Sequence, residues 1–286
     1  MHFGKVLIFG VGLIGASFAR GLKAAHAVDE IIGFGRTPKS LKAAYDLGVI
    51  DEVGINPGAD VREADLILVA TPVGQMPEIF ARIAPYLGEH TIVTDAGSTK
   101  GDVVEAARAA FGNKIGQFVP GHPIAGAETS GAVSSKVDLY QGRKVVLTPL
   151  LENAVADIEK VKRAWELCGA DVRILDAETH DRVFAAVSHL PHLLAYALVD
   201  EFAHRPNADQ LFDYAAAGFR DFTRIAGSHP EMWRDISLAN RTALLAELDR
   251  YSAALMRVRQ ALVNSDGDAL AAIYAHARDT RENWSH

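Results

Sequence analysis

Two polar residues with glycine and proline neighbours are the first candidates for chemistry in this sequence. His122 lies in the segment His122-Pro-Ile-Ala-Gly-Ala-Glu128, and Ser98 lies in the segment Asp95-Ala-Gly-Ser98-Thr-Lys100. When a hydride leaves a carbon that bears a hydroxyl, a proton remains on the oxygen, and an imidazole can accept it at neutral pH. A serine hydroxyl can hydrogen-bond at the same place, although a serine in a glycine turn is often a simple cap. We therefore predict His122 and Ser98 as catalytic residues of a redox reaction on a small anionic substrate.

A glycine-rich segment near the start of the chain, Gly10-Val-Gly12-Leu-Ile-Gly15, predicts a dinucleotide site. It directly follows an apolar run and opens a helical pattern, which is the context that this fingerprint requires. Gly10 permits a tight turn, Gly12 lets the backbone approach a pyrophosphate, and Gly15 allows close packing of helix on strand. The backbone of Leu13 and Ile14 then offers free N–H groups to the phosphates. The alternative is a tight turn that binds no ligand.

The residues after the second predicted strand indicate which cofactor this site prefers. An NAD site usually has an acidic residue here that binds the ribose 2′-hydroxyl, but the sequence has Phe34-Gly35-Arg36-Thr37. Arg36 can pair with the 2′-phosphate of NADP and stack on adenine, with Gly35 and Thr37 beside it. We predict NADP in preference to NAD; the alternative is an NAD site with Arg36 as a solvated surface residue. Thr71 and Pro72 follow a further strand and complete the predicted cofactor site near the nicotinamide.

The first half of the chain alternates apolar strand-like runs with helical patterns, which predicts a parallel sheet covered on both faces. The runs that we assign to strands are 6–9, 31–34, 66–70, 91–94, 117–119, 144–147 and 172–175, and the helices are 12–25, 40–47 and 153–167. Ligands bind at the carboxyl edge of such a sheet, and the segments that follow the strands bring Thr71, Ser98 and His122 to that edge. We predict an α/β, Rossmann-like, doubly wound dinucleotide-binding domain over residues 1–176.

Strand-like runs end near residue 177, and helical periodicity continues from there. Ser228-His-Pro-Glu231 predicts a capping box at the start of a helix that runs to about Val263. Within it, apolar residues recur at alternating spacings of four and three, at Leu244, Leu248, Tyr251, Leu255, Val258 and Leu262. Such a stripe packs either on its own domain or on a second copy of the chain. We predict an all-α domain over residues 177–286 that binds substrate and forms a homodimer.

Composition and charge argue against several classes of function. The formal net charge of −7 disfavours nucleic-acid binding, which needs a basic surface. Cys168 is the only cysteine, so neither an intrachain disulfide nor a cysteine metal cage can form. No apolar run approaches the ~18 residues that span a bilayer, and no signal-like segment precedes the first strand. These features predict a cytoplasmic protein that binds a small molecule and neither nucleic acid nor membrane.

Taken together, the motifs resemble those of the prephenate/arogenate dehydrogenase (cyclohexadienyl dehydrogenase) family. The resemblance covers nearly the whole chain, in order: Gly10-x-Gly-x-x-Gly15, Asp95-x-Gly-Ser98-x-Lys100, Gly121-His-Pro-x-Ala-Gly-x-Glu128, Ser188-His-Leu-Pro-His192, and Asp221-Phe-Thr-Arg224 with Trp233 beyond it. It implies an NAD(P)-dependent oxidative decarboxylation of prephenate or L-arogenate in tyrosine biosynthesis. It also implies a helical C-terminal domain that forms dimers.

The resemblance also assigns roles to individual polar residues. His122 would hydrogen-bond the ring C4 hydroxyl with Ser98 orienting both, and Arg224 would bind a substrate carboxylate. Residues that would contribute further to the substrate pocket are His189, His192, Glu128, Asp221 and Trp233. The chemistry agrees, because prephenate is a dianion and a guanidinium can clamp a carboxylate with two parallel hydrogen bonds. A structural ion pair between Arg224 and Asp221 is a competing role, and the two roles can coexist.

Three other functions compete with this prediction. A metal centre at His189 and His192 is disfavoured, because Pro191 opposes a regular helix and no carboxylate has ligand spacing, so we predict no metal. An NADP-linked β-hydroxy-acid dehydrogenase has the same two-domain plan, but such enzymes usually have a catalytic lysine in place of the histidine. A non-catalytic dinucleotide-binding sensor, whose helical half binds a partner protein, would not need His122, Ser98 and Arg224.

Overall fold

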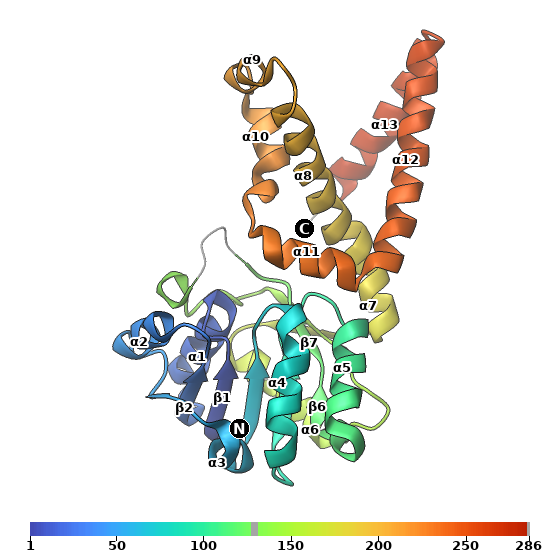
Figure 1. Ribbon diagram of the computed structural model, residues 1–286. Helices are drawn as coiled ribbons and strands as arrows, with labels where there is room; N and C mark the ends of the chain where they lie inside the picture. The colour runs from blue at the N-terminus through green and yellow to red at the C-terminus, as the bar shows by residue number, and fades with distance from the viewer. Residues whose placement is uncertain (127–130, 285–286) are drawn as a thin grey trace. The chain divides into compact units, whose positions relative to one another are not determined.

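The computed structural model describes residues 1–126 and 131–284. The chain divides into two compact units, Met1–Asn240 and a second unit that begins at Arg241. The first unit contains every strand of the described residues, together with the helices up to Ala239 (Figure 1). The domain boundary that we predict after residue 176 marks a change of sequence pattern, and it stays a prediction.

A six-stranded parallel sheet lies at the centre of the first unit. Its strands are β1 (Phe3–Phe9), β2 (Val28–Phe34), β3 (Glu52–Val53), β4 (Leu66–Val69), β5 (Ile92–Asp95) and β6 (Phe118–Val119). They lie in the order β3-β2-β1-β4-β5-β6, and every neighbouring pair is parallel. Val6 of β1 pairs with Ile31 on one side and with Leu66 on the other. The strand order reverses between β1 and β4, and open α/β sheets bind their ligands at such a reversal.

Helices cover both faces of this sheet, which confirms the predicted doubly wound α/β fold (Figure 1). These helices are α1 (Leu13–Ala24), α2 (Pro38–Asp46), α3 (Pro57–Glu63), α4 (Met76–Ile83), α5 (Gly101–Phe111) and α6 (Val155–Leu167). On one face Val6 and Ile8 pack in a core with Trp165 of α6. On the other face Leu7 and Phe9 pack in a core with Phe80 of α4. Because β1 is buried on both faces, its sequence is a continuous apolar run without alternation.

The chain after β6 departs from the single sheet that we predict. β7 (Gly121–Pro123), β8 (Lys144–Leu147) and β9 (Asp171–Ile174) form a separate three-stranded sheet in the order β7-β8-β9. β7 pairs antiparallel with β8, and β8 pairs parallel with β9. His122 lies opposite Val146 in this sheet, and so belongs to a short strand and not to a loop. Glycine and proline on either side of His122 are poor strand formers, which is why the sequence pattern did not indicate β7.

A continuous helical run begins at Ala177. It comprises α7 (Ala177–Phe184), a π-helical turn η5 (Ala185–His189) and α8 (Leu190–Ala203). Pro191 lies in the first turn of α8 and does not end the run, because the π-helical turn before it changes the hydrogen-bond pattern. Contrary to our expectation, this 27-residue run is apolar enough, by length and composition only, to cross a membrane. One such helix is weak evidence, because core helices of soluble proteins pass the same test.

Short helices complete the first unit. They are α9 (Ala208–Asp213), α10 (Ala217–Thr223), the 3-10 turn η6 (Arg224–Gly227) and α11 (Pro230–Ala239). The predicted capping box is wrong, because α11 begins after His229 and no side chain caps it. The predicted helix to Val263 is also wrong, since α11 ends one residue before Asn240. Asn240 is buried, and its side-chain amide makes hydrogen bonds within the first unit.

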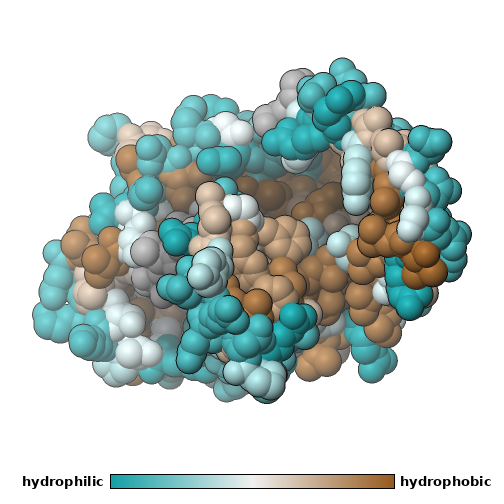
Figure 2. All heavy atoms as spheres, turned by 90° about the horizontal axis from the view of Figure 1, so that it is seen from above, coloured by the Kyte–Doolittle hydropathy of each residue, from teal (hydrophilic) through white to brown (hydrophobic). Residues whose placement is uncertain are grey.

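The second unit is helical in its described residues. α12 (Arg241–Val263) and α13 (Gly267–Asn283) pack against each other. In the predicted apolar stripe of α12, Leu244 is buried, but Leu255 is 51% exposed and Leu262 is 59% exposed. Other exposed apolar side chains of this unit are Leu245, Met256, Val263, Ile273, Tyr274 and Trp284. Hydrophobic side chains are visible on the face of the molecule drawn in Figure 2.

Candidate active site

The loop between β1 and α1 is a close-packed turn with one open side. Gly10 has φ +95°, a conformation that favours glycine, and a Cβ there would lie 2.6 Å from Ala70 O. A Cβ on Gly15 would lie 2.4 Å from Gly10 O, so α1 starts in tight contact with the strand. At Gly12, by contrast, a Cβ would meet nothing within 4 Å. Gly12 is the N-cap of α1, so a helix N-terminus begins beside this open space, as a phosphate site requires.

The segment after β4 lies against this loop. A Cβ on Gly10 would lie 2.9 Å from Thr71 Cγ2, and Pro72 next to it is exposed. Thr71 Oγ1 is buried and has no hydrogen-bond partner among the described residues. Leaving a buried hydroxyl unpaired costs free energy, and a bound polar ligand would remove that cost. The two loops meet where the strand order reverses, so the residues present fit a dinucleotide cofactor.

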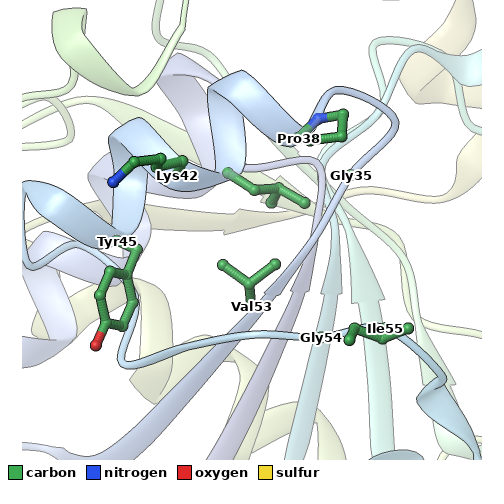
Figure 3. A pocket seen from close by; sticks show the side chains of 8 residues that line it. Gly35, Pro38, Lys42, Tyr45, Val53, Gly54 and Ile55 are labelled. Atoms are coloured by element: carbon green, nitrogen blue, oxygen red, sulfur yellow. The ribbon is translucent and has the colours of Figure 1, made fainter.

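The carboxyl end of β2 is open to solvent. Gly35, Arg36 and Thr37 are all exposed there. An open hollow of about 420 Å³ lies beside them, and Figure 3 shows Pro38 and Tyr45 of α2 and Val53 of β3 around it. Arg36 is exposed and does not line this hollow, and its pairing with a 2′-phosphate stays a prediction.

A buried ion pair joins the two segments that carry the predicted catalytic residues. The side chains of Lys100 and Asp95 are both 0% exposed, and Lys100 Nζ donates to Asp95 and, at 2.7 Å, to Gly121 O. Asp95 also accepts from the backbone N–H of Gly121 at 3.0 Å and of Gly97 at 2.7 Å. Buried charges persist only when they are paired and hydrogen-bonded. These bonds therefore hold the turn after β5 and the start of β7 in a fixed relation.

His122 is buried, with 8% of its surface exposed. Its Nδ1 lies 2.8 Å from His180 Nε2, and its ring meets the Phe184 ring at an angle of 62° with centroids 4.9 Å apart. Burial first, and then the neighbouring His180 and Lys100, hold the pKa of His122 well below 6.5. The imidazole is therefore neutral at neutral pH. Its Nε2 takes no part in the bond to His180.

His180 and Asp181, at the middle of α7, extend this contact. His180 Nδ1 lies 2.8 Å from Asp181 Oδ1. The same carboxylate accepts the backbone N–H groups of Lys100 and Gly101, each at 2.8 Å. Burial lowers the pKa of His180; burial would raise the pKa of Asp181, but hydrogen bonds from His180 and the two amides lower it overall. Asp181 is therefore ionised and His180 neutral at neutral pH.

Ser98 is half-buried in the loop after β5, next to His189. His189 is 1% exposed, and its Nδ1 accepts a hydrogen bond from the Asn240 amide at 3.1 Å. His189 Nε2 is buried and has no hydrogen-bond partner among the described residues. Burial lowers the pKa of His189 to about 4. The backbone of Ser98 is close enough to His189 to raise that pKa slightly, against the effect of burial. His189 is therefore neutral and forms part of the interior wall behind the Ser98 loop.

His192, Trp233 and Arg224 form a second polar group. The rings of His192 and Trp233 stack with centroids 3.5 Å apart and planes 18° apart, and His192 Nδ1 donates to Ser188 O at 2.9 Å. Burial lowers the pKa of His192, and the charge of nearby Arg224 lowers it further. The hydrogen bond to Ser188 acts in the opposite direction and raises that pKa. Trp233 also lies 6.1 Å, centroid to centroid, from His189. Through His189, Trp233 connects this group to the Ser98 loop. The guanidinium of Arg224 is close enough to the His192 ring, which stacks on Trp233, to lower the pKa of that ring.

Other predicted site residues are not part of these groups. Asp221 is exposed on α10, and among the described residues it makes no ion pair with Arg224. Glu128 lies outside the described residues. Within residues 1–126 and 131–284, no group of three or more His, Cys, Asp or Glu side chains could hold a metal ion.

Sequence reasoning missed His180, Asp181 and Asn240 as parts of the site. The only local signal was a histidine next to a carboxylate, in the first helix after the last strand. With 11 histidines in the chain, that signal alone could not select His180. Its importance depends on the contact with His122, which lies 58 residues earlier in the sequence.

Two family models account for most of the chain. The prephenate dehydrogenase nucleotide-binding domain matches residues 18–174, and the prephenate dehydrogenase dimerization domain matches residues 176–276. This chain belongs to the prephenate dehydrogenase family. The resemblance seen in the motifs is thereby confirmed, and membership supports neither the β-hydroxy-acid dehydrogenase nor the sensor.

Members of the prephenate dehydrogenase family match this chain over nearly its full length. The cyclohexadienyl dehydrogenase of Zymomonas mobilis is 35% identical over 281 residues, which is 98% of this chain and 95% of the relative. The prephenate dehydrogenase of Bacillus subtilis is 36% identical over 279 residues, which is 97% of this chain and 75% of the relative. A crystal structure of prephenate dehydrogenase from A. aeolicus, in complex with hydroxyphenyl propionate and NAD+, has a TM-score of 0.92 and 38% identity, and the match covers 99% of this chain and 98% of that one. These likenesses support an oxidoreductase.

Proposed function

We propose that this protein oxidises and decarboxylates prephenate, L-arogenate or both with a nicotinamide cofactor, in the biosynthesis of tyrosine. The observation that carries the proposal is the buried His122 of β7, which lies against His180 and Phe184 and whose pKa is held well below 6.5. A base that is neutral at physiological pH can accept a proton from a hydroxyl as the neighbouring C–H bond breaks. The family match and the NAD+ bound to the A. aeolicus relative support the same chemistry.

The reaction breaks two bonds of the substrate ring and makes the ring aromatic. His122 accepts the hydrogen bond of the C4 hydroxyl, holds its proton while the C4–H bond breaks, and returns it to the phenolic oxygen. A nicotinamide cofactor held by the glycine loop and Thr71 would supply the acceptor for the hydride. The ring carboxylate leaves as CO2, and its bonding electrons enter the ring. Aromatisation makes the reaction strongly downhill, so the protein has mainly to position the substrate.

Positioning the substrate falls to the residues around the two polar groups. Arg224 binds a substrate carboxylate, because a guanidinium offers two parallel N–H donors to it. His192 and Trp233, stacked on each other beside it, provide a flat wall for the substrate ring. Ser98 orients the C4 hydroxyl and His122. The remaining substrate residues in the proposal are His189 in the wall behind Ser98, and Asp221 and Glu128 in polar contacts at the pocket.

The cofactor in this proposal is NADP in preference to NAD. Gly12 at the N-terminus of α1, with the backbone of Leu13, Ile14 and the flanking glycines, would hold its pyrophosphate. Its adenosine end meets Gly35, Arg36 and Thr37. No acidic side chain stands directly after β2, so nothing there repels a 2′-phosphate, and Arg36 can pair with it. Thr71 and Pro72 lie beside the nicotinamide end.

The assembly in this proposal is a cytoplasmic homodimer. The model that matches residues 176–276 describes a dimerization domain, and α12 and α13 expose apolar side chains that a second copy can cover. Residues 177–286 are the proposed substrate-binding and dimerisation domain, and residues 1–176 the proposed dinucleotide-binding domain. A single buried cysteine suits the reducing cytoplasm.

Two glycine substitutions separate cofactor binding from folding. Gly12→Ala is expected to leave the melting temperature unchanged, because its Cβ enters open space, but to raise the KM for the cofactor strongly, because that space holds the pyrophosphate. Gly15→Ala is expected to destabilise the fold by about 1–3 kcal/mol, since its Cβ would lie 2.4 Å from a carbonyl oxygen. Thermal melts and cofactor titrations measure the two effects. An unchanged cofactor KM in Gly12→Ala would contradict the proposed pyrophosphate site.

A crossed spectrophotometric assay tests the proposed function. Prephenate and L-arogenate are each assayed with NADP and with NAD, and formation of the reduced cofactor is followed. We expect turnover with at least one substrate and a higher kcat/KM with NADP than with NAD. In Arg36→Ala the kcat/KM with NADP should fall while that with NAD stays unchanged. A wild-type preference for NAD would overturn the cofactor assignment, and no turnover with either substrate would overturn the function.

A further inference from the structure

The side chains of Asp181, His180 and His122 form a hydrogen-bonded line, in which both imidazoles are buried and the carboxylate is 15% exposed. Asp181 Oδ1 lies 2.8 Å from His180 Nδ1, and His180 Nε2 lies 2.8 Å from His122 Nδ1. We propose that His180 and Asp181 are positioning residues that fix the tautomer of His122, with hydrogen on Nδ1 and a lone pair on Nε2. The effect on kcat that we expect from this arrangement rests on the proposed function, whereas the assignment of the tautomer does not.

The carboxylate sets the pattern at one end of the line. Asp181 receives three N–H donors, from the backbone of Lys100 and Gly101 and from the ring of His180. Lys100 is the N-cap of α5, so the carboxylate lies at the N-terminus of an 11-residue helix, where negative charge is stabilised. The Asn240 amide donates to the Asp181 carbonyl at 2.8 Å and holds its backbone. An ionised carboxylate only accepts hydrogen bonds, so His180 Nδ1 must carry a hydrogen.

The hydrogen on His180 Nδ1 determines the next bond. A neutral imidazole with hydrogen on Nδ1 has only a lone pair on Nε2, so His180 Nε2 accepts. His122 Nδ1, 2.8 Å away, must then donate, and His122 Nε2 is left with its lone pair. The opposite direction would need a second proton on His180. That proton is disfavoured, because the ring is 0% exposed and burial lowers the pKa of His180. The hydrogen bond to Asp181 opposes this effect without reversing it, and the charge of Lys100 adds to it.

This pattern gives His122 the nitrogen that the chemistry needs. A lone pair on Nε2 can accept the C4 hydroxyl proton, whereas an N–H there could only donate. When His122 takes the proton, its Nδ1–H bond to His180 remains, and the new positive charge is stabilised through His180 by the Asp181 carboxylate. The line therefore holds the base ready before the reaction and stabilises its protonated form during it.

Nitrogen-15 spectra of the histidine-labelled protein at neutral pH test the tautomer directly. Ring nitrogens with and without hydrogen give well-separated signals, and those of His122 are identified by their loss in His122→Asn. We expect His122 Nε2 to carry no hydrogen in the wild-type protein. A hydrogen on that nitrogen would overturn the proposal, whatever the activity. If the nitrogen is bare but neither prephenate nor L-arogenate reacts, the proposed function fails while the tautomer assignment stands.

Variants of His180 test the kinetic consequence. His180→Leu removes the acceptor and should lower kcat by roughly 100-fold, as displacement of a catalytic group does, with the cofactor KM unchanged. His180→Gln should retain most of the activity, because an amide can point its oxygen at His122 and its N–H at Asp181. His204→Leu is the matched control, since the His204 side chain is 77% exposed, and it should behave as wild type. An unchanged kcat in a folded His180→Leu would overturn the positioning role, as would a His180→Gln as impaired as His180→Leu.

Discussion

Replacing His122 by asparagine is expected to lower kcat by roughly 100- to 10,000-fold, the range that general acid–base residues contribute. The asparagine amide can still bond to His180 from the position of the imidazole Nδ1. It has no atom at the position of Nε2, so nothing accepts the hydroxyl proton in the transition state. The KM for substrate should change little, because the lost interaction strengthens only as the C–H bond breaks. Steady-state kinetics at saturating cofactor measure both quantities.

His204→Asn is the control for this substitution. It makes the same change at an exposed histidine near the end of α8, and kcat should not move. The pH profile adds a second check: with its pKa held well below 6.5, His122 stays unprotonated when the pH falls from 8 to 6.5. A kcat in His122→Asn equal to that of the wild type would remove His122 from the reaction.

Replacing Arg224 by alanine is expected to raise the KM for substrate by roughly 10- to 150-fold, with the cofactor KM unchanged. The estimate follows from the loss of hydrogen bonds to a charged group, which contribute about 1.5–3 kcal/mol. The structure places this guanidinium close enough to His192 for its charge to lower the pKa of that ring. Titration of substrate at saturating cofactor, and of cofactor at saturating substrate, separates the two KM values.

Two further arginine variants sharpen this result. Arg224→Lys keeps the charge but loses the two parallel donors, so its substrate KM should fall between those of wild type and Arg224→Ala. Arg234→Ala removes an exposed guanidinium that is paired with Asp235 at 2.6 Å, and its KM values should match the wild type. A substrate KM in Arg224→Ala equal to that of the wild type would show that Arg224 does not bind the substrate carboxylate.

Local sequence patterns predicted the elements of the central sheet well, because those elements depend on local properties. The apolar run before Gly10 is buried on both faces, and the glycine spacing has the steric basis that the motif implies. β3 was missed because its two residues, Glu52 and Val53, form no apolar run, and β7 because its pairing with β8 depends on a distant strand. The end of α11 was missed because helical periodicity continues past Asn240, whose side chain is used for tertiary hydrogen bonds.

Local sequence patterns predicted only part of the candidate site, because some of its contacts are not local. His122 and Ser98 follow strands that end at one edge of the fold, so their neighbourhood could be expected from the order of elements. The buried environment that makes His122 a neutral base could not be expected. It depends on His180 from α7, and on the Asp95–Lys100 pair that joins β5 to β7. Such contacts join residues far apart in sequence, and no local pattern encodes them.

In the proposed reaction, hydride removal at ring C4 and loss of CO2 occur together at this site. The most direct measurement uses prephenate and L-arogenate with deuterium at C4, and follows both the label and the CO2. We expect deuterium on the reduced nicotinamide and one CO2 released for each reduced cofactor formed. Reduced cofactor without matching CO2, or without the label, would contradict the proposed reaction.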